Sequence, residues 1–117
     1  MVITITLQGI DVKNGHISLS TVCSVSITGH SGLASKGNDI VCAGVSALSQ
    51  SVVLALEFYE IAHNINQQEG VLEFSVNVSE LTDTQKICCE SIVSVFIIGI
   101  NEIRKQYPEF VHVTIHE

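Results

Sequence analysis

Two residues in one glycine-rich stretch have the chemistry of a nucleophile and its base. His30 follows Gly29 at the end of an alternating segment, and Cys42 stands near the start of an expected helix. A thiol attacks a carbonyl carbon as its thiolate, which a nearby imidazole or the positive end of a helix stabilises. Gly32 and Gly37 give the intervening loop the freedom to bring the two side chains together. The pattern indicates a Cys–His pair, and the alternative is a core cysteine with a solvated histidine.

The segment that carries Cys42 reads as a helix from residue 40 to about residue 62. Apolar residues recur there at helical spacing. Asn38 and Asp39 form an N-cap signal, because a short polar side chain accepts hydrogen bonds from the first amides of a helix. With Asp39 as the cap, Cys42 is the third helical residue, within reach of the helix dipole. The amides of the same turn are suited to hold an oxyanion.

The remaining chain alternates between strand and helix patterns. Period-two alternation predicts four strands, and the pattern Thr82-Asp83-Thr84-Gln85 opens a second helix that Pro108 ends. The strands cover residues 2–7, 17–27, 72–78 and 111–115, and the second helix covers residues 83–107. Residues 64–70 are polar and end in glycine, which predicts a connection. We expect one domain over residues 1–117, an α+β two-layer sandwich of ββαβαβ order with two helices packed on one mainly antiparallel sheet.

The composition limits the binding partners and the cellular compartment that we expect for this protein. Hydrophobic residues make up 46% of it and the formal net charge is −7. Repulsion by phosphates argues against nucleic-acid binding, whereas a basic protein or peptide fits as a partner. The apolar run of residues 87–103 is short for a membrane span and contains Glu90 and Asn101. No signal-peptide pattern opens the chain, so we expect a cytoplasmic protein without membrane contact, where thiols stay reduced.

The second predicted helix has an unusual distribution of apolar residues. Between residues 87 and 100 it is apolar almost all round. A helix of this kind is covered on more than one side, and a chain of 117 residues has little else with which to cover it. The pattern therefore predicts a subunit interface.

The other cysteines and histidines show no metal-site pattern. Cys23, Cys88 and Cys89 have no partner at the C-x-x-C spacing, and they fall on apolar segments. His112 and His116 share one face of the last strand, but residues four apart along a strand are roughly 13 Å apart, too far for one metal ion. We expect packing cysteines, solvated histidines, no metal and no cofactor.

The stretch around Cys42 resembles a known family signature. Gly29-His30-Ser31 is followed, after a short loop, by Gly37-Asn38-Asp39-Ile40-Val41-Cys42-Ala43-Gly44-Val45-Ser46-Ala47-Leu48. This is similar to the pattern GHA, a glycine-containing loop and GxDIVCAAVSxL of the ribosomal-processing cysteine protease family, Prp. The order of elements is similar over essentially the whole chain. Ser31 and Gly44 stand where that pattern has alanine, and Lys36 has no role that we assign.

The resemblance implies a cysteine endopeptidase with a catalytic dyad of Cys42 and His30. Its substrate would be the N-terminal segment of a large-subunit ribosomal protein precursor, from which it removes an extension, and it would be a homodimer. The supporting positions carried over by the resemblance are Gly29, Gly37, Asp39 and Ser46. Two other classes stay open: a non-enzymatic ribosome-assembly binding protein with the same dimeric fold, and a redox-sensing thiol protein.

Overall fold

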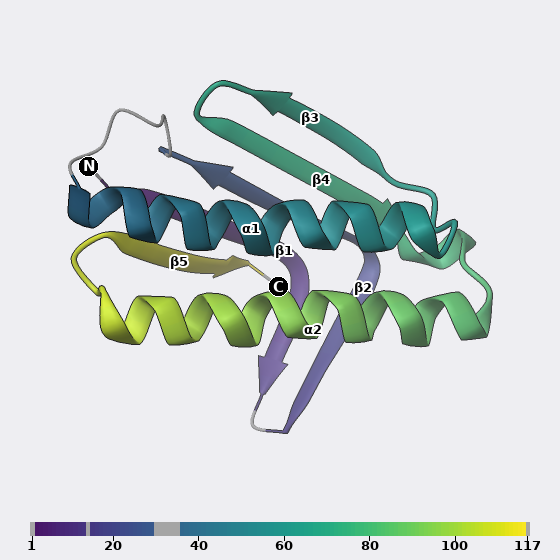
Figure 1. The fold of residues 1–117 in the computed structure, drawn as a ribbon. Helices are drawn as coiled ribbons and strands as arrows, with labels where there is room; N and C mark the ends of the chain where they lie inside the picture. The colour runs from purple at the N-terminus through teal and green to yellow at the C-terminus, as the bar shows by residue number, and fades with distance from the viewer. Residues whose placement is uncertain (1, 14, 30–35, 117) are drawn as a thin grey trace.

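The computed structural model describes residues 2–13, 15–29 and 36–116. Five strands form one sheet in the order β3-β4-β2-β1-β5, and two helices cover one of its faces (Figure 1). In chain order the elements are β1 (Ile3–Lys13), β2 (His16–Thr28), α1 (Lys36–Phe58), β3 (Asn64–Gln68), β4 (Val71–Asn77), the 3-10 helix η1 (Val78–Glu80), α2 (Asp83–Gln106) and β5 (Val111–His116). The prediction of a two-layer α+β domain is confirmed.

The sheet is mixed, with one parallel pair. β1 and β2 form an antiparallel hairpin, and β4 pairs antiparallel with β2 on one side and with β3 on the other. β5 runs parallel to β1, with Val111 opposite Ile3, because α2 carries the chain back along the sheet before β5 begins. The expectation of a mainly antiparallel sheet is confirmed.

Residues 64–68 form a strand instead of the connection that their polar composition predicted. β3 lies at the edge of the sheet, and all of its residues are exposed. Gln68 lies opposite Val71 and Asn64 opposite Ser75. Gly70, with a φ of 76°, helps to make the tight turn between the strands. Backbone pairing with β4 forms this strand, and such pairing needs no apolar side chain, so the element order becomes ββαββαβ.

The core lies between the sheet and the helices. Alternate side chains of the central strands point toward the helices, as period-two alternation predicts for a sheet that is half-buried. The side chains at most 3% exposed include those of Ile5, Leu7, Val25, Ile27, Leu72 and Phe74. The ring of Phe74 meets the ring of Phe96 from α2 edge-on, with 6.5 Å between centroids.

α1 and α2 lie side by side and antiparallel over the sheet (Figure 1). Glycines bring them close together. A Cβ atom at Gly44 would lie 3.3 Å from Cδ1 of Ile103, and one at Gly99 would lie 2.9 Å from Cδ1 of Leu48. The contacts fix which side of α1 faces α2, which matters for the placement of Cys42.

α2 begins and ends where the sequence predicts. The Thr82 hydroxyl accepts a hydrogen bond from the Gln85 amide at 3.1 Å, and the Gln85 side chain accepts one from the Thr82 amide at 3.0 Å. This reciprocal pair is the capping box. The helix ends at Gln106, before Pro108, which cannot continue helical hydrogen bonding.

The outward side of the helical layer remains apolar. Phe58 of α1 is 80% exposed and Val95 of α2 is 64% exposed. A hollow of about 220 Å³ between the helices is lined by Leu48, Ser51, Val52, Ala55, Ile92, Val95 and Phe96. Among the described residues, segment 40–58 of α1 is long and apolar enough to cross a membrane by length and composition alone. Here its inward side chains are part of the core.

Candidate active site

α1 begins earlier than the N-cap signal predicted. The helix starts at Lys36, so Asp39 is not its N-cap and Cys42 is the seventh helical residue instead of the third. An acidic residue such as Asp39 is favourable inside the first turn as well as at the N-cap, and this explains why the predicted helix start was too late. The dipole effect falls off within that turn, so the helix alone gives the Cys42 thiolate little stabilisation.

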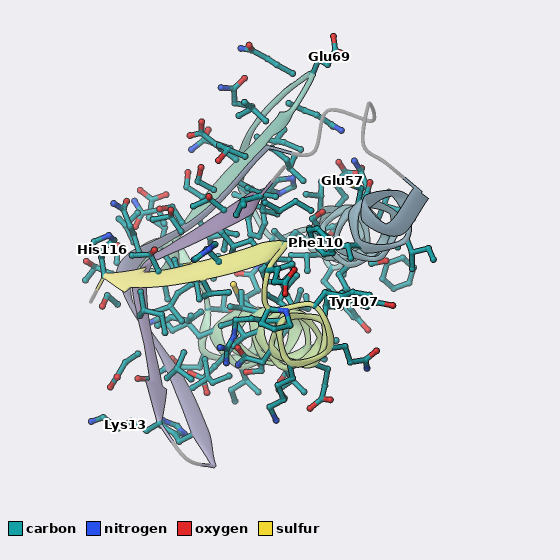
Figure 2. The ribbon with its side chains drawn as sticks, turned by 90° about the vertical axis from the view of Figure 1, so that its left-hand side faces the viewer. Lys13, Glu57, Glu69, Tyr107, Phe110 and His116 are labelled. Carbon is teal, nitrogen blue, oxygen red and sulfur yellow. The ribbon has the colours of Figure 1, made fainter. Side chains whose placement is uncertain are left out.

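Cys42 lies at the margin of the core. Its side chain is 9% exposed, against 1% for Val41 and 0% for Val45. Gly44 faces α2, and at roughly 100° of rotation per residue Cys42 lies on the opposite flank of α1. That flank is turned toward the β3–β4 hairpin, because α2 and this hairpin lie on opposite sides of α1 (Figures 1 and 2). Cys42 is therefore a buried member of the core cluster, on the flank of α1 that faces the hairpin.

Ser46 lies one turn after Cys42 on the same flank and is half-buried. Its carbonyl accepts a hydrogen bond from the Ser49 hydroxyl at 3.2 Å, and the Val45 carbonyl accepts one from the same hydroxyl at 2.7 Å. These bonds satisfy the hydroxyl of Ser49, which is buried. Small side chains thus continue from Cys42 along this flank of α1.

The end of β2 fixes where the segment with the predicted histidine starts. Gly29 has a φ of 100°, and a Cβ atom there would overlap the carbonyl oxygen of Val2, so both conformation and space require glycine. Its amide donates a hydrogen bond to the Gly70 carbonyl at 3.0 Å. No local pattern reveals this contact, because Gly29 and Gly70 are distant in the sequence. His30 itself lies outside the described residues, so its approach to Cys42 stays a prediction.

Gly37 and Asp39 fall in the first turn of α1. Residues 36–39 are described here by their helical backbone, which places residues 38 and 39 one turn before Cys42 on the same flank. The first four amides of a helix lack partners within it. The unpartnered amides are therefore those of the turn that begins at Lys36, and not those of the turn that contains Cys42, which a cap at Asp39 predicted.

The remaining cysteines are packing residues, as predicted. Cys23 of β2 is 1% exposed, Cys89 of α2 is 0% exposed, and Cys88 is half-buried against the core. A hydrogen bond joins Cys23 to Cys89, and this bond, together with burial, raises the pKa of the Cys89 thiol. The Cys89 thiol therefore stays protonated at neutral pH, which is unsuitable for a nucleophile.

The histidines of the described segments lie outside any metal site. His112 and His116 are exposed on the open face of the sheet, as expected. Nδ1 of His63 lies 2.8 Å from the Ile61 carbonyl oxygen, which accepts the hydrogen bond. Within the described residues, no group of three or more His, Cys, Asp or Glu side chains is placed to hold a metal ion.

Solved structures share this fold over nearly the whole chain. SMU.848 from Streptococcus mutans has a TM-score of 0.70 and 29% identity, with 98% of this chain and 94% of that chain covered. An essential ribosomal processing protease, Prp from S. aureus, in complex with a substrate peptide, has a TM-score of 0.73 and 21% identity, with 97% and 99% covered. The chain therefore has the two-layer α+β fold of a class that includes a ribosomal processing protease.

Sequence comparison identifies the family within that class. The family model of cysteine protease Prp matches residues 10–112. The ribosomal processing cysteine protease Prp of Bacillus subtilis (strain 168) is 27% identical over 96 residues, which cover 80% of this chain and 85% of that protein. This chain belongs to the Prp family of cysteine proteases. The resemblance drawn from the sequence is confirmed, and the enzyme class is that of a cysteine protease.

Proposed function

We propose that this protein is a cysteine endopeptidase whose catalytic dyad is Cys42 and His30. The proposal rests on the positions of Cys42 and Gly29 relative to the β3–β4 hairpin. Cys42 lies at the margin of the core, on the flank of α1 that faces the β3–β4 hairpin. The turn of the same hairpin binds the amide of Gly29, the residue before His30. This arrangement supports a meeting of sulfur and imidazole beside the start of α1.

The proposed reaction follows from the chemistry of these two groups. His30 takes the proton from the Cys42 thiol, and the thiolate attacks the carbonyl carbon of a peptide bond. Amides at the start of α1 stabilise the oxyanion of the tetrahedral intermediate. The C–N bond breaks and the amine leaves with the proton from His30. Water then gives a proton to His30 and hydrolyses the thioester, which releases the acid and restores the thiol.

The proposed substrate is the N-terminal extension of a large-subunit ribosomal protein precursor. Two relatives support it: the B. subtilis relative is a ribosomal processing cysteine protease, and the S. aureus relative binds a substrate peptide. The net charge of −7 supports a basic substrate, since proteins that bind RNA carry basic patches. The reaction would then take place in the cytoplasm, where ribosomal proteins are made.

We also propose that two copies associate through the outward side of α1 and α2. Large apolar side chains are exposed on both helices there, with an apolar hollow between them. Contiguous exposed apolar surface on a soluble protein often marks an interaction site. A second copy would cover the side of α2 that the sheet leaves open.

The test is cleavage of a purified ribosomal-protein precursor under reducing conditions. We expect Cys42→Ala and His30→Ala each to lower the rate by about a thousandfold or more, because members of one catalytic unit fail together. The controls are Cys88→Ala, which changes a thiol of α2, and His112→Ala, which changes an imidazole of β5; both should cleave like the original protein. Mass spectrometry of the product identifies the bond that breaks.

The cleavage that remains in the variants distinguishes the proposed protease from the alternative functions. Undiminished trimming by Cys42→Ala would refute the dyad. A protein that binds the precursor tightly and never cleaves it would instead be a non-enzymatic assembly factor. The alkylation rate of Cys42 gives a second measurement: its pKa should lie below the usual thiol value and should rise in His30→Ala, because the imidazolium favours the thiolate.

A further inference from the structure

The edge of the sheet at β3 lacks the features that usually protect an edge strand. β3 has the sequence Asn-Ile-Asn-Gln-Gln, without lysine, proline or an acidic residue, and it is exposed along its whole length. In the part of the chain that the structure describes, it pairs with β4 alone. Natural proteins block such edges with charge, proline or a covering segment, because an open edge is a template for another strand. β3 is thus competent to accept an extended peptide.

The surroundings of β3 carry charge of one sign. The β3–β4 hairpin, residues 64–77, contains two acidic residues, Glu69 and Glu73, and no lysine or arginine. Glu69 stands at the tip of the β3–β4 hairpin, at the opposite end of the sheet from Lys13 (Figure 2). The other edge strand, β5, follows a helix end that carries Arg104 and Lys105. An anionic edge of this kind attracts a cationic peptide and repels an acidic one.

The open face of the sheet beside β3 is hollowed. The hollow has a volume of about 430 Å³, and hydroxyl and amide side chains from four strands line it, together with the carboxylate of Glu73. Asn66 of β3 lies opposite Glu73 and shares this face. A strand added next to β3 would direct every second side chain to the same face. A lysine or arginine side chain there would reach the rim of the hollow beside Glu73.

We propose that β3 docks an extended, basic segment of the protein substrate as an added strand, with a cationic side chain held over the hollow by Glu73. The inference rests on the proposed function and specifies how the protein holds the substrate. β3 leads from Gln68 through the turn to Gly70, whose carbonyl binds Gly29. A peptide along β3 therefore runs toward the segment that carries the predicted dyad.

Binding is tested in the Cys42→Ala protein, so that cleavage plays no part. The probe is a ten-residue peptide of alternating lysine and threonine, and its control alternates glutamate and threonine. We expect the lysine peptide to shift the backbone amide resonances of residues 64–68 and of Glu73, and the glutamate peptide to bind at least about tenfold more weakly. Added salt should weaken the binding of the lysine peptide, because these charges are solvent-exposed.

Two further measurements separate strand addition from loose charge attraction. Glu73→Gln should weaken lysine-peptide binding several-fold, whereas Glu109→Gln, at an exposed position before β5, should leave it unchanged. N-methylation of alternate peptide residues should abolish binding in one register and spare it in the other, since only alternate amides of an added strand face β3.

Three results would overturn the proposal. The first is equal loss of binding for both N-methylated registers, which means that the backbone makes no ladder. The second is a set of shifts that leaves β3 untouched. The third is a shift of β3 resonances with protein concentration alone, which means that a second copy occupies the edge. Each can occur while the dyad still cleaves the precursor, so failure here is distinct from failure of the proposed enzyme.

Discussion

Cys42 lies between two neighbours with opposite surroundings. Val41 is buried against the sheet, whereas Ala43 is exposed to solvent. The sequence periodicity places Cys42 beside the apolar stripe without clearly assigning it to the stripe, whereas the structure includes it in the core cluster, with 9% of it exposed. A thiol in such a place is shielded from bulk water and still borders a surface.

Gly29 is the residue whose substitution tests the entry of that loop. We expect Gly29→Ala to lower the free energy of unfolding by about 2–4 kcal/mol, because a Cβ atom combines a left-handed backbone with overlap on the Val2 carbonyl. Gly70→Ala is the matched control, since it shares a positive φ but would meet no atom within 4 Å. It should lose only about 1–2 kcal/mol. Urea unfolding measures both, and equal losses would contradict the role of the Val2 contact.

At the level of elements, β3 and α1 show what neighbours add to a local pattern. β3 has a polar composition that predicts a loop, yet its register with β4 makes it a strand. α1 extends one turn beyond the expected cap. In both cases the backbone takes hydrogen bonds that side-chain periodicity does not describe. These two differences are also the ones that shape the candidate site.

The contact between β2 and α2 through Cys23 and Cys89 gives a pH-dependent stability. The unfolded Cys89 thiol titrates near 9.0, and its folded pKa is raised by the hydrogen bond to Cys23 and by burial. The same bond lowers the pKa of the Cys23 thiol, so above pH 9 the unfolded chain has released both protons while the folded chain still keeps that of Cys89. The stabilisation by Cys89 is therefore present below pH 9 and is lost as pH rises above it. We expect the free energy of unfolding to fall there by as much as about 1.4 kcal/mol per pH unit.

The measurement is urea unfolding between pH 7 and pH 10.5. A variant with both Cys23→Ala and Cys89→Ala should be less stable at pH 7 and should lose less stability above pH 9 than the original protein. Ser91→Ala, at an exposed position of the same helix, should keep the original slope. A double variant whose slope matches that of the original protein would show that the buried thiols make no such contribution.

The molecule as a whole has three sides that differ in their surface chemistry. The open face of the sheet is polar, the β3–β4 end is acidic, and the outward side of the helices is apolar. These surfaces suit different partners: a basic peptide at the acidic edge and a second copy at the apolar helices. Because they lie on different parts of the fold, both partners could bind at once.

The proposed homodimer is tested by one charge on the apolar helices. We expect Val95→Glu to convert the protein from dimer to monomer in analytical ultracentrifugation, because Val95 is 64% exposed and borders the apolar hollow. Thr114→Glu, at an exposed position of β5, should remain dimeric. Thermal unfolding of both variants checks that each is folded. A dimeric Val95→Glu protein would place the interface elsewhere, and a monomeric original protein would refute the dimer.

The sequence by itself determined most of this fold, because its signals are local. Alternation along β1, β2 and β4 reports one buried face, and Thr82 with Gln85 reports a helix start through bonds that span only three residues. The spacing from Gly29 to Ser46 was enough to indicate the family, which the comparison over residues 10–112 confirmed. The same local sequence pattern gives the same local structure, so such structure can be predicted from the sequence.

Only the tertiary structure decided the strand β3, the early start of α1 and the bond between Gly29 and Gly70. Each depends on backbone groups that are far apart in the chain or that carry no side-chain signal. The flank of α1 on which Cys42 lies became meaningful only when α2 and the β3–β4 hairpin were placed on opposite sides of it. Hydrogen bonds between distant backbone groups produce no periodic pattern in the sequence, so only the folded structure shows them.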